Sequence, residues 1–188
     1  MKKTSYLLLL AGLTVSVRIT QATTVIPPTF DELVSQAEVI FQGDVTDVKS
    51  QWVGEGAQRH IVSYVTFKVE DALKGTPGQS YTIRMLGGTV DGETMGVSDA
   101  PKFKVGDKDI LFVQNNGSQF VPLVGIMHGR FHVKRDQTGQ EVVSNNENEP
   151  VKNVARLGRA AEAADGPEAN LTAADFKAAV KSKLQAPK

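Results

Sequence analysis

The sequence predicts a mainly β domain with a short helix on its N-terminal side and a second helix at its C-terminal end. Between Val39 and Glu70, two runs alternate β-branched or aromatic residues with polar residues, and a glycine-containing turn joins them. Further apolar runs, separated by clusters of Gly, Asn and Pro, continue to Ser144 and bring the total to roughly seven strands. The second run is long enough to favour a curved strand, either shared between two sheets or bent around a small barrel.

The first 22 residues have the layout of a secretory signal peptide. Lys2 and Lys3 precede the apolar run Tyr6–Val17, and a small-residue pattern ends at Ala22. The apolar run is too short to span a membrane. We therefore expect cleavage after Ala22, which leaves 166 of the 188 residues, enough for one domain of ordinary size. Retention of the segment as an N-terminal anchor is the alternative.

The charge balance argues against two classes of partner. The full chain carries 21 basic and 21 acidic side chains, and the expected signal peptide holds three of the basic ones and none of the acidic ones. A mildly acidic mature chain without a basic run lacks the electrostatic footprint for nucleic acid or anionic lipid. The chain has no cysteine, which excludes thiol nucleophiles, thiolate zinc sites and disulfides. Together with the signal peptide, this favours a secreted or periplasmic bacterial protein.

The first helix is expected over Phe30–Ala37. Thr29 is a typical N-cap residue, and Asp31 and Glu32 place negative charge in the first turn, where the helix dipole favours it. An apolar stripe at i, i+3, i+4 and i+7 comprises Phe30, Leu33, Val34 and Ala37. The expected role of this helix is to cover one end of the β core.

The first strand is expected over Val39–Lys49, and Trp52 and Val53 either extend it or open the next loop. Val48 breaks the alternation of apolar and polar residues. A bulge near Gly43–Asp44 would account for the break.

The second strand is expected from Ile61 to Val69 and the third over residues 81–86. Residues 71–75 lie between them and are expected to form a separate tight element that ends on Gly75. A turn at residues 76–78 then follows, because Pro and Gly are both present there.

Residues 87–101 are predicted to form a long loop or flexible hairpin, since they contain four glycines and few core candidates. The continuous apolar run 109–114 predicts an interior strand. A hairpin turn at residues 115–118 is expected next. A strand over Phe120–Val124 would then pair with the strand before the turn, and Pro122 would weaken the hydrogen bonds between the two strands.

The last predicted strands cover residues 129–134 and 141–143, so that the β-barrel domain is expected to span residues 23–144. A polar linker is expected over 145–170, with a break at Asp165–Pro167. A helix over 171–188 follows, with Thr172 as its cap and an apolar stripe that includes Phe176, Val180 and Leu184. This helix either docks on the barrel or remains free on its linker.

Candidate catalytic and metal-binding groups are few. His128 and His132 are four residues apart, but on a strand this spacing spans roughly 13 Å, too far for one ion. Asp91, Glu93 and Asp99 could supply oxygen ligands for calcium, although their spacing matches no EF-hand loop. No nucleophile-elbow, dinucleotide or phosphate-loop motif is present, and we expect no metal and no cofactor. Dispersed carboxylates of a glycosidase type remain an alternative.

Several segments of the chain, taken together, resemble those of a known group of domains. They are I-F-x-G-x-V at residues 40–45, V-x-x-x-L-K-G at 69–75, YTIRMLGG at 81–88, P-x-F-x-x-G-D-x-D-I-L-F-V at 101–113 and VGIMHGRFHVKRD at 124–136. Over about Phe30 to Val143, the chain resembles a group of small exported bacterial domains whose core is similar to the OB-type barrel of the tissue inhibitors of metalloproteinases. The resemblance implies an OB-like Greek-key barrel with added strands. It implies no inhibitory residue, because those inhibitors bind the protease zinc through an N-terminal cysteine.

The leading functional hypothesis is an exported, non-catalytic binding or accessory module for an unidentified protein or extracellular ligand. The expected contact surface is the loop Thr89–Lys102 with the neighbouring strand edge. A secreted peptidase inhibitor is the first alternative, and a hydrolase with dispersed carboxylates is the second. The candidate contact residues are Arg84, Asp91, Glu93, Arg130 and His132.

Overall fold

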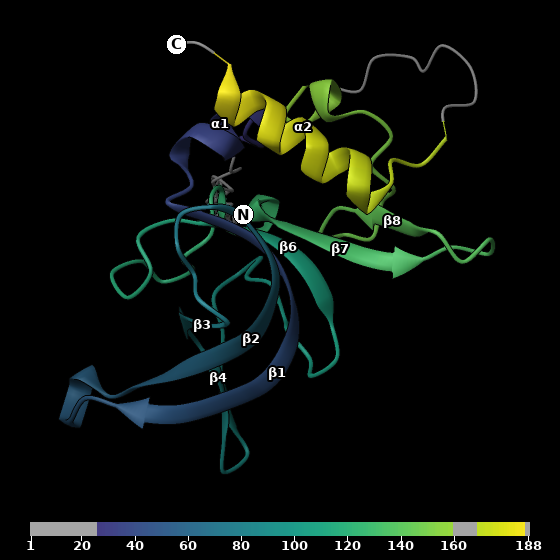
Figure 1. The fold of residues 1–188 in the computed structure, drawn as a ribbon. Coiled ribbons are helices and arrows are strands. Elements are labelled where there is room, and N and C mark those ends of the chain that lie inside the picture. Colours follow the sequence, from purple (N-terminus) through teal and green to yellow (C-terminus); the bar gives the residue numbers. More distant parts are fainter. Residues whose placement is uncertain (1–25, 160–168, 187–188) are drawn as a thin grey trace, which may run out of the picture.

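The computed structural model describes residues 26–159 and 169–186. The expected signal peptide and the break at 165–167 lie outside the described residues. The described strands form a six-stranded antiparallel sheet in the order β3-β2-β1-β6-β7-β8 and a separate two-stranded hairpin, β4-β5 (Figure 1). The prediction of a mainly β fold with one helix near each end is confirmed.

The elements of the sheet and the hairpin have the following bounds: β1 (Val39–Val53), β2 (His60–Lys74), β3 (Ser80–Leu86), β4 (Gly88–Val90), β5 (Glu93–Met95), β6 (Lys108–Val113), β7 (Arg130–Arg135) and β8 (Glu141–Ser144). The helices are α1 (Phe30–Gln36) and α2 (Ala173–Gln185). Short 3₁₀ turns cover Gly56–Gln58, Ile126–Gly129 and Val154–Arg156.

β1 and β2 form one long hairpin around which the other strands are arranged. β1 pairs with β2 along its length, and its first residues, Val39 to Asp44, pair with β6 on the other side. One register shift falls between Gln42 and Gly43, where the sequence predicted a bulge, and two others lie close by. Such shifts bend a strand, and Figure 1 shows β1 and β2 curving away from the helices toward the tip of their hairpin.

Two predicted elements are wrong. Residues 71–75 form no separate element, because β2 continues to Lys74 and pairs with β1 as far as Lys74, which lies opposite Ile40. Residues 120–124 form no full strand: they make a single bridge, between Val113 and Leu123. Pro122 has no N–H to donate, which limits the ladder there. The expected loop at 87–101 contains the short hairpin β4-β5, whose turn has Asp91 and Gly92 at positive φ.

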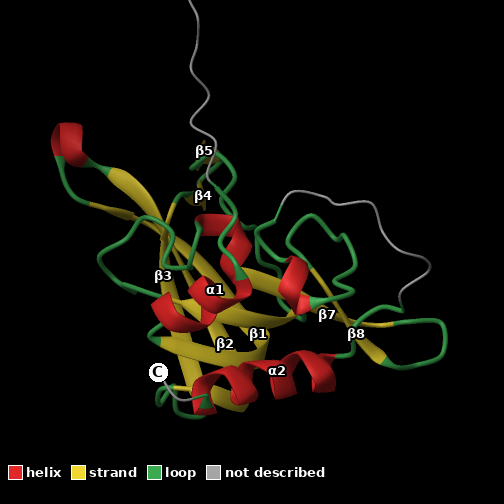
Figure 2. Cartoon of the chain, turned by 90° about the horizontal axis from the view of Figure 1, so that it is seen from above, coloured by secondary structure: helices red, strands yellow, loops and turns green. Residues whose placement is uncertain are grey.

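The sheet has a hydrophobic cluster on each of its faces. The cluster under the helices includes Phe30, Leu33, Phe112, Phe131 and Phe176. The cluster on the other face includes Phe41, Phe67, Ile83, Phe103 and Leu111. Figure 2 shows α1 and α2 together on one side of the sheet, far from the tip of the β1–β2 hairpin. The helices therefore cover one face, and the β4-β5 hairpin and loops lie over the other.

The C-terminal helix α2 docks on the sheet. Phe176 is fully buried and its ring centroid lies 4.8 Å from that of Phe131 and 6.0 Å from that of Phe30. The described part of the segment expected to be a linker also packs on the core, since Val151 is buried and Leu157 contacts the same cluster. A backbone hydrogen bond from the Leu171 amide to the Val151 carbonyl joins the two segments.

α1 begins with the N-cap that the sequence predicted, extended into a capping box. The Thr29 hydroxyl accepts a hydrogen bond from the Glu32 amide, and the Glu32 carboxylate accepts one from the Thr29 amide at 2.8 Å. Thr29→Ala is expected to lower the free energy of unfolding by about 1 kcal/mol, measured by urea denaturation, because the Glu32 amide loses its acceptor and the Glu32 carboxylate loses the hydroxyl donor. Ser35→Ala on the exposed side of the same helix is the control, and an equal loss in both variants would contradict the capping argument.

Candidate functional site

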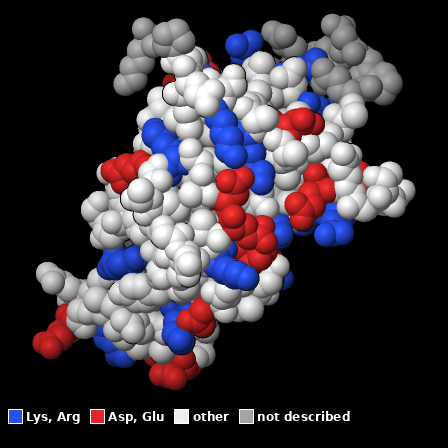
Figure 3. Space-filling view, viewed as in Figure 1, with Lys and Arg blue, Asp and Glu red and all other residues white. Residues whose placement is uncertain are grey.

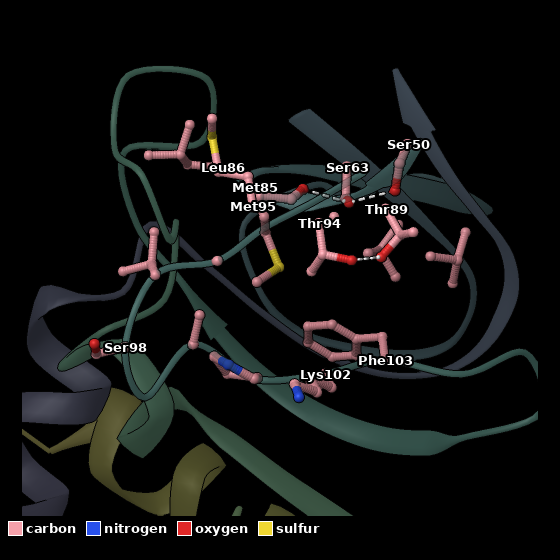
Figure 4. Close-up of a pocket in the computed structure, with 18 of the residues that line it drawn as sticks. Ser50, Ser63, Met85, Leu86, Thr89, Thr94, Met95, Ser98, Lys102 and Phe103 are labelled. Carbon is pink, nitrogen blue, oxygen red and sulfur yellow. Dashed lines mark hydrogen bonds between the residues drawn. The ribbon is translucent and has the colours of Figure 1, made fainter. Parts of the chain in front are cut away.

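A cavity of about 860 Å³ lies between the β4-β5 hairpin and the strands β1 and β2. Residues 97–103, which connect the hairpin to β6, form its remaining wall. In Figure 4, the hydroxyl groups of Ser50, Ser63, Thr89 and Thr94 lie across the cavity from Phe103 and Lys102. Most of the loop Thr89–Lys102, which the sequence predicted as a contact surface, lines this cavity.

Two adjacent glycines, Gly87 and Gly88, allow the backbone that enters the β4-β5 hairpin to pass close over β1 and β2 beside the cavity. Gly87 and Gly88 have φ values of 100° and 140°, which side-chain-bearing residues rarely adopt. A Cβ atom on Gly88 would lie 2.3 Å from the hydroxyl oxygens of both Ser50 and Ser63. Gly88 therefore allows the backbone to lie directly against these two hydroxyl groups.

The cavity combines an apolar floor with a hydroxyl-bearing rim. Its apolar lining includes Val48, Val65, Met85 and Phe103. Ser63 donates a hydrogen bond of 2.6 Å to the Gly87 carbonyl and lies 2.8 Å from the Ser50 hydroxyl. The hydroxyls of Thr89 and Thr94 are 2.9 Å apart. Among the described lining residues, only Asp99 and Lys102 are charged, and both are exposed.

A second, smaller cavity of about 480 Å³ lies beside the first, and Ala100 and Lys102 line both. Behind it is a buried ion pair: Asp109 on β6 has 0 % of its surface exposed and Arg130 on β7 has 2 %. Asp109 Oδ2 accepts hydrogen bonds from Arg130 Nε at 3.0 Å and Nη2 at 2.9 Å. Asp109 Oδ1 lies 2.8 Å from His132 Nδ1. Asp109 therefore holds both side chains from one buried position.

The five predicted contact residues fall in three places. Arg130 and His132 are neighbours on one face of β7, as alternation along a strand requires, and both line the smaller cavity. Arg84 lies on β3, where its backbone amide donates to Asn116 Oδ1. Asp91 and Glu93 are exposed at the tip of the β4-β5 hairpin and line neither cavity. The structure thus brings only Arg130 and His132 together at a cavity, and the role of all five as contacts stays a prediction.

The histidines and acidic residues considered for metal binding lie in separate elements. His128 sits in the 3₁₀ turn Ile126–Gly129, where burial lowers the pKa of its imidazole, and His132 lies in β7. Within residues 26–159 and 169–186, no three His, Cys, Asp or Glu side chains are grouped so that they could hold a metal ion. In the same ranges, no helix combines the length and hydrophobicity needed to cross a membrane.

A close pair of carboxylates lies outside both cavities. Lys108 Nζ is 2.9 Å from the Glu70 carboxylate and 3.8 Å from Asp44 Oδ1. The hydrogen bond from Lys108 holds the pKa of Glu70 below its ordinary value, whereas burial and the charge of Glu70 raise the pKa of Asp44. Neither carboxylate lines either cavity. The cluster instead joins three neighbouring strands, since Asp44 lies in β1, Glu70 in β2 and Lys108 in β6. On the face drawn in Figure 3, basic and acidic side chains are interspersed in the same way.

Sequence reasoning missed Asp109 and the lysines near it. Asp109 opens the apolar run of β6, and an acid directly before four buried apolar residues was a usable sign of a buried partner. Lys102 and Lys104 lie in the segment before β6 and Lys134 lies in β7, so no continuous basic run marks the three in the chain.

Comparison with known proteins found no protein-family model that matches the chain and no curated protein that is significantly similar to it. The fold defines the chain as a mainly β protein with a six-stranded antiparallel sheet and two helices. Its function must therefore be argued from the two cavities and the residues around them.

Proposed function

We propose that the protein is an exported, non-catalytic binding module, and that the cavity under the β4-β5 hairpin holds its ligand. The observation that supports this is the cavity itself, whose volume of about 860 Å³ falls within the roughly 300–1,000 Å³ typical of small-molecule sites. An apolar floor with a few fixed polar groups is also the usual composition of such sites. Export rests on the signal-peptide pattern of residues 1–22.

The hydroxyl groups indicate what kind of ligand the cavity would take. Because the Ser63 proton is used on the Gly87 carbonyl, Ser50 must donate to Ser63, which leaves the Ser50 oxygen free only to accept. In the Thr89–Thr94 pair one hydroxyl proton remains free to donate. The matching ligand is an uncharged small molecule with an apolar body and a hydroxyl or amide group.

We also propose an OB-like Greek-key barrel as the architecture of the β core. The three-strand meander β1-β2-β3, with β6 added on the other side of the bent strand β1, is the strand arrangement expected of such a barrel. The Leu86 amide on β3 donates to the Phe120 carbonyl, so the free edge of β3 already contacts the loop after β6. Peptidase inhibition and hydrolysis with dispersed carboxylates remain alternative predictions.

Filling the cavity tests the proposed ligand site. Thr94→Trp is expected to weaken binding of neutral, hydroxyl- or amide-bearing fragments at least tenfold, because an indole placed at the rim occupies their space. Binding is followed by the methyl NMR signals of Met85 and Met95, which line the cavity.

Thr82→Trp is the matched control for this test. Thr82 is also an exposed strand threonine whose hydroxyl lies 2.9 Å from another threonine hydroxyl, that of Thr66, but it does not line the cavity. Fragment binding should be unchanged in this variant. A fragment screen with no saturable methyl shift, or equal weakening in both variants, would count against the site.

A further inference from the structure

We infer that the smaller cavity beside β7 is a binding site for an oxyanion group, such as a phosphate, sulfate or carboxylate. The inference does not depend on the ligand proposed for the larger cavity. It rests on three features: a buried frame that fixes the cavity wall, an imidazole held in one orientation, and an excess of cationic side chains at the mouth.

The frame is built on Arg130, each of whose three guanidinium nitrogens donates to another group of the protein. Besides its bonds to Asp109, Arg130 Nη2 lies 2.8 Å from Asp107 Oδ2, and Nη1 donates to the Lys102 carbonyl at 2.7 Å. The guanidinium also lies over the Phe103 ring, 4.0 Å from its centroid. Arg130 is therefore a positioning residue: it fixes the segment 102–107, which carries two of the lysines.

The imidazole of His132 is held by the same buried aspartate. Asp109 and His132 are paired directly across β6 and β7. Because an ionised carboxylate can only accept, the 2.8 Å contact places a proton on Nδ1 and leaves Nε2 for another partner. His132 is part of the cavity lining, so Nε2 is the atom that remains to meet a ligand there.

The mouth of the cavity carries more positive than negative charge. Lys102, Lys104 and Lys134 line it, together with the side chains of Asn146 and Asn148, and Asp107 is its one acidic lining residue. Within the described part of the chain, none of these lysines lies within ion-pair distance of a carboxylate. Lys134 Nζ donates to Asn148 Oδ1, which draws that lysine toward the cavity.

The charge count favours an anion over a cation. The two aspartates are already used by Arg130, whereas the three lysines are not neutralised by a described acid. With His132 neutral, the cluster of Asp107, Asp109, Arg130 and the three lysines carries a net charge of about +2. A group of fixed donors and cations around a concave surface is the arrangement that binds oxyanions.

Inorganic phosphate is the probe that tests this site, in an NMR titration of the full mature chain at constant ionic strength with chloride as the balancing anion. We expect saturable shifts of the His132 ring and of the Lys102 and Asn146 amides. Lys102→Gln and Lys134→Gln should each weaken binding about fivefold, since one unit charge at contact distance in water is worth about 1 kcal/mol. These variants remove the charge, keep a polar side chain only one atom shorter than lysine, and leave the buried frame intact.

Lys68→Gln is the control, because Lys68 is exposed on β2 and lies outside both cavities. Equal effects of all three lysine variants, or shifts that rise linearly without saturation, would overturn the inference. The variant Thr94→Trp should bind phosphate normally, so failure of the fragment site and failure of the anion site are distinguishable. Tighter binding of phenyl phosphate than of phosphate would assign the oxyanion to a larger ligand, and equal binding would assign it to the free ion.

Discussion

Replacing Arg130 with methionine is expected to lower the free energy of unfolding by about 3–5 kcal/mol, the range seen when one partner of a buried ion pair is removed. The loss follows from Asp109, which has 0 % of its surface exposed and would lose the hydrogen bonds from Nε and Nη2. The Lys102 carbonyl and Asp107 would lose donors as well. Guanidinium denaturation of the mature protein measures the effect.

Arg84→Met provides the comparison for this prediction. Arg84 is also an arginine on a strand of the same sheet, but it is partly exposed, and its backbone amide donates to Asn116 Oδ1. Its replacement is expected to change stability by less than about 0.5 kcal/mol, as surface substitutions usually do. If Arg130→Met costs no more than Arg84→Met, the aspartate must find other partners and the proposed frame around the anion cavity is wrong.

The strands could be predicted because their side chains alternate locally. The helix cap at Thr29, the bulge near Gly43 and the strand around Phe131 all depend on residues within a few positions of one another. The two wrong elements show where local patterns fail. Residues 71–74 lack strong strand propensity. They nevertheless form part of a strand because they pair with β1, where Ala72 lies opposite Phe41.

The candidate sites could be predicted only in part, because they join segments that are distant in the chain. The sequence pattern of one strand was enough to propose His132 as a contact residue. Its partner Asp109 lies 23 positions earlier and is identified only by the pairing of β6 with β7. The larger cavity depends on the crossing at Gly87–Gly88, which places the β4-β5 hairpin over Ser50 and Ser63. A glycine pair in the sequence predicts a turn but not what lies beneath it.

Docking of α2 is expected to contribute as much stability as the buried ion pair. Phe176→Ala should lower the free energy of unfolding by about 3–5 kcal/mol, the usual cost of removing a buried phenyl ring. Phe176 has 0 % of its surface exposed and lies among the rings of Phe30, Phe112 and Phe131, so its removal leaves a cavity lined by parts of α1 and the sheet. Urea denaturation measures the loss, with circular dichroism reporting on the helices.

Leu184→Ala is the control on the same helix, because Leu184 belongs to the predicted apolar stripe but is 38 % exposed in the last turn of α2. It is expected to cost less than about 1 kcal/mol, since little of the removed surface is buried. A large loss for Phe176→Ala with a small loss for Leu184→Ala would establish that the first half of α2 anchors the helix to the sheet. Two small losses would instead mean that α2 contributes little to the core and that the sheet and α1 fold without it.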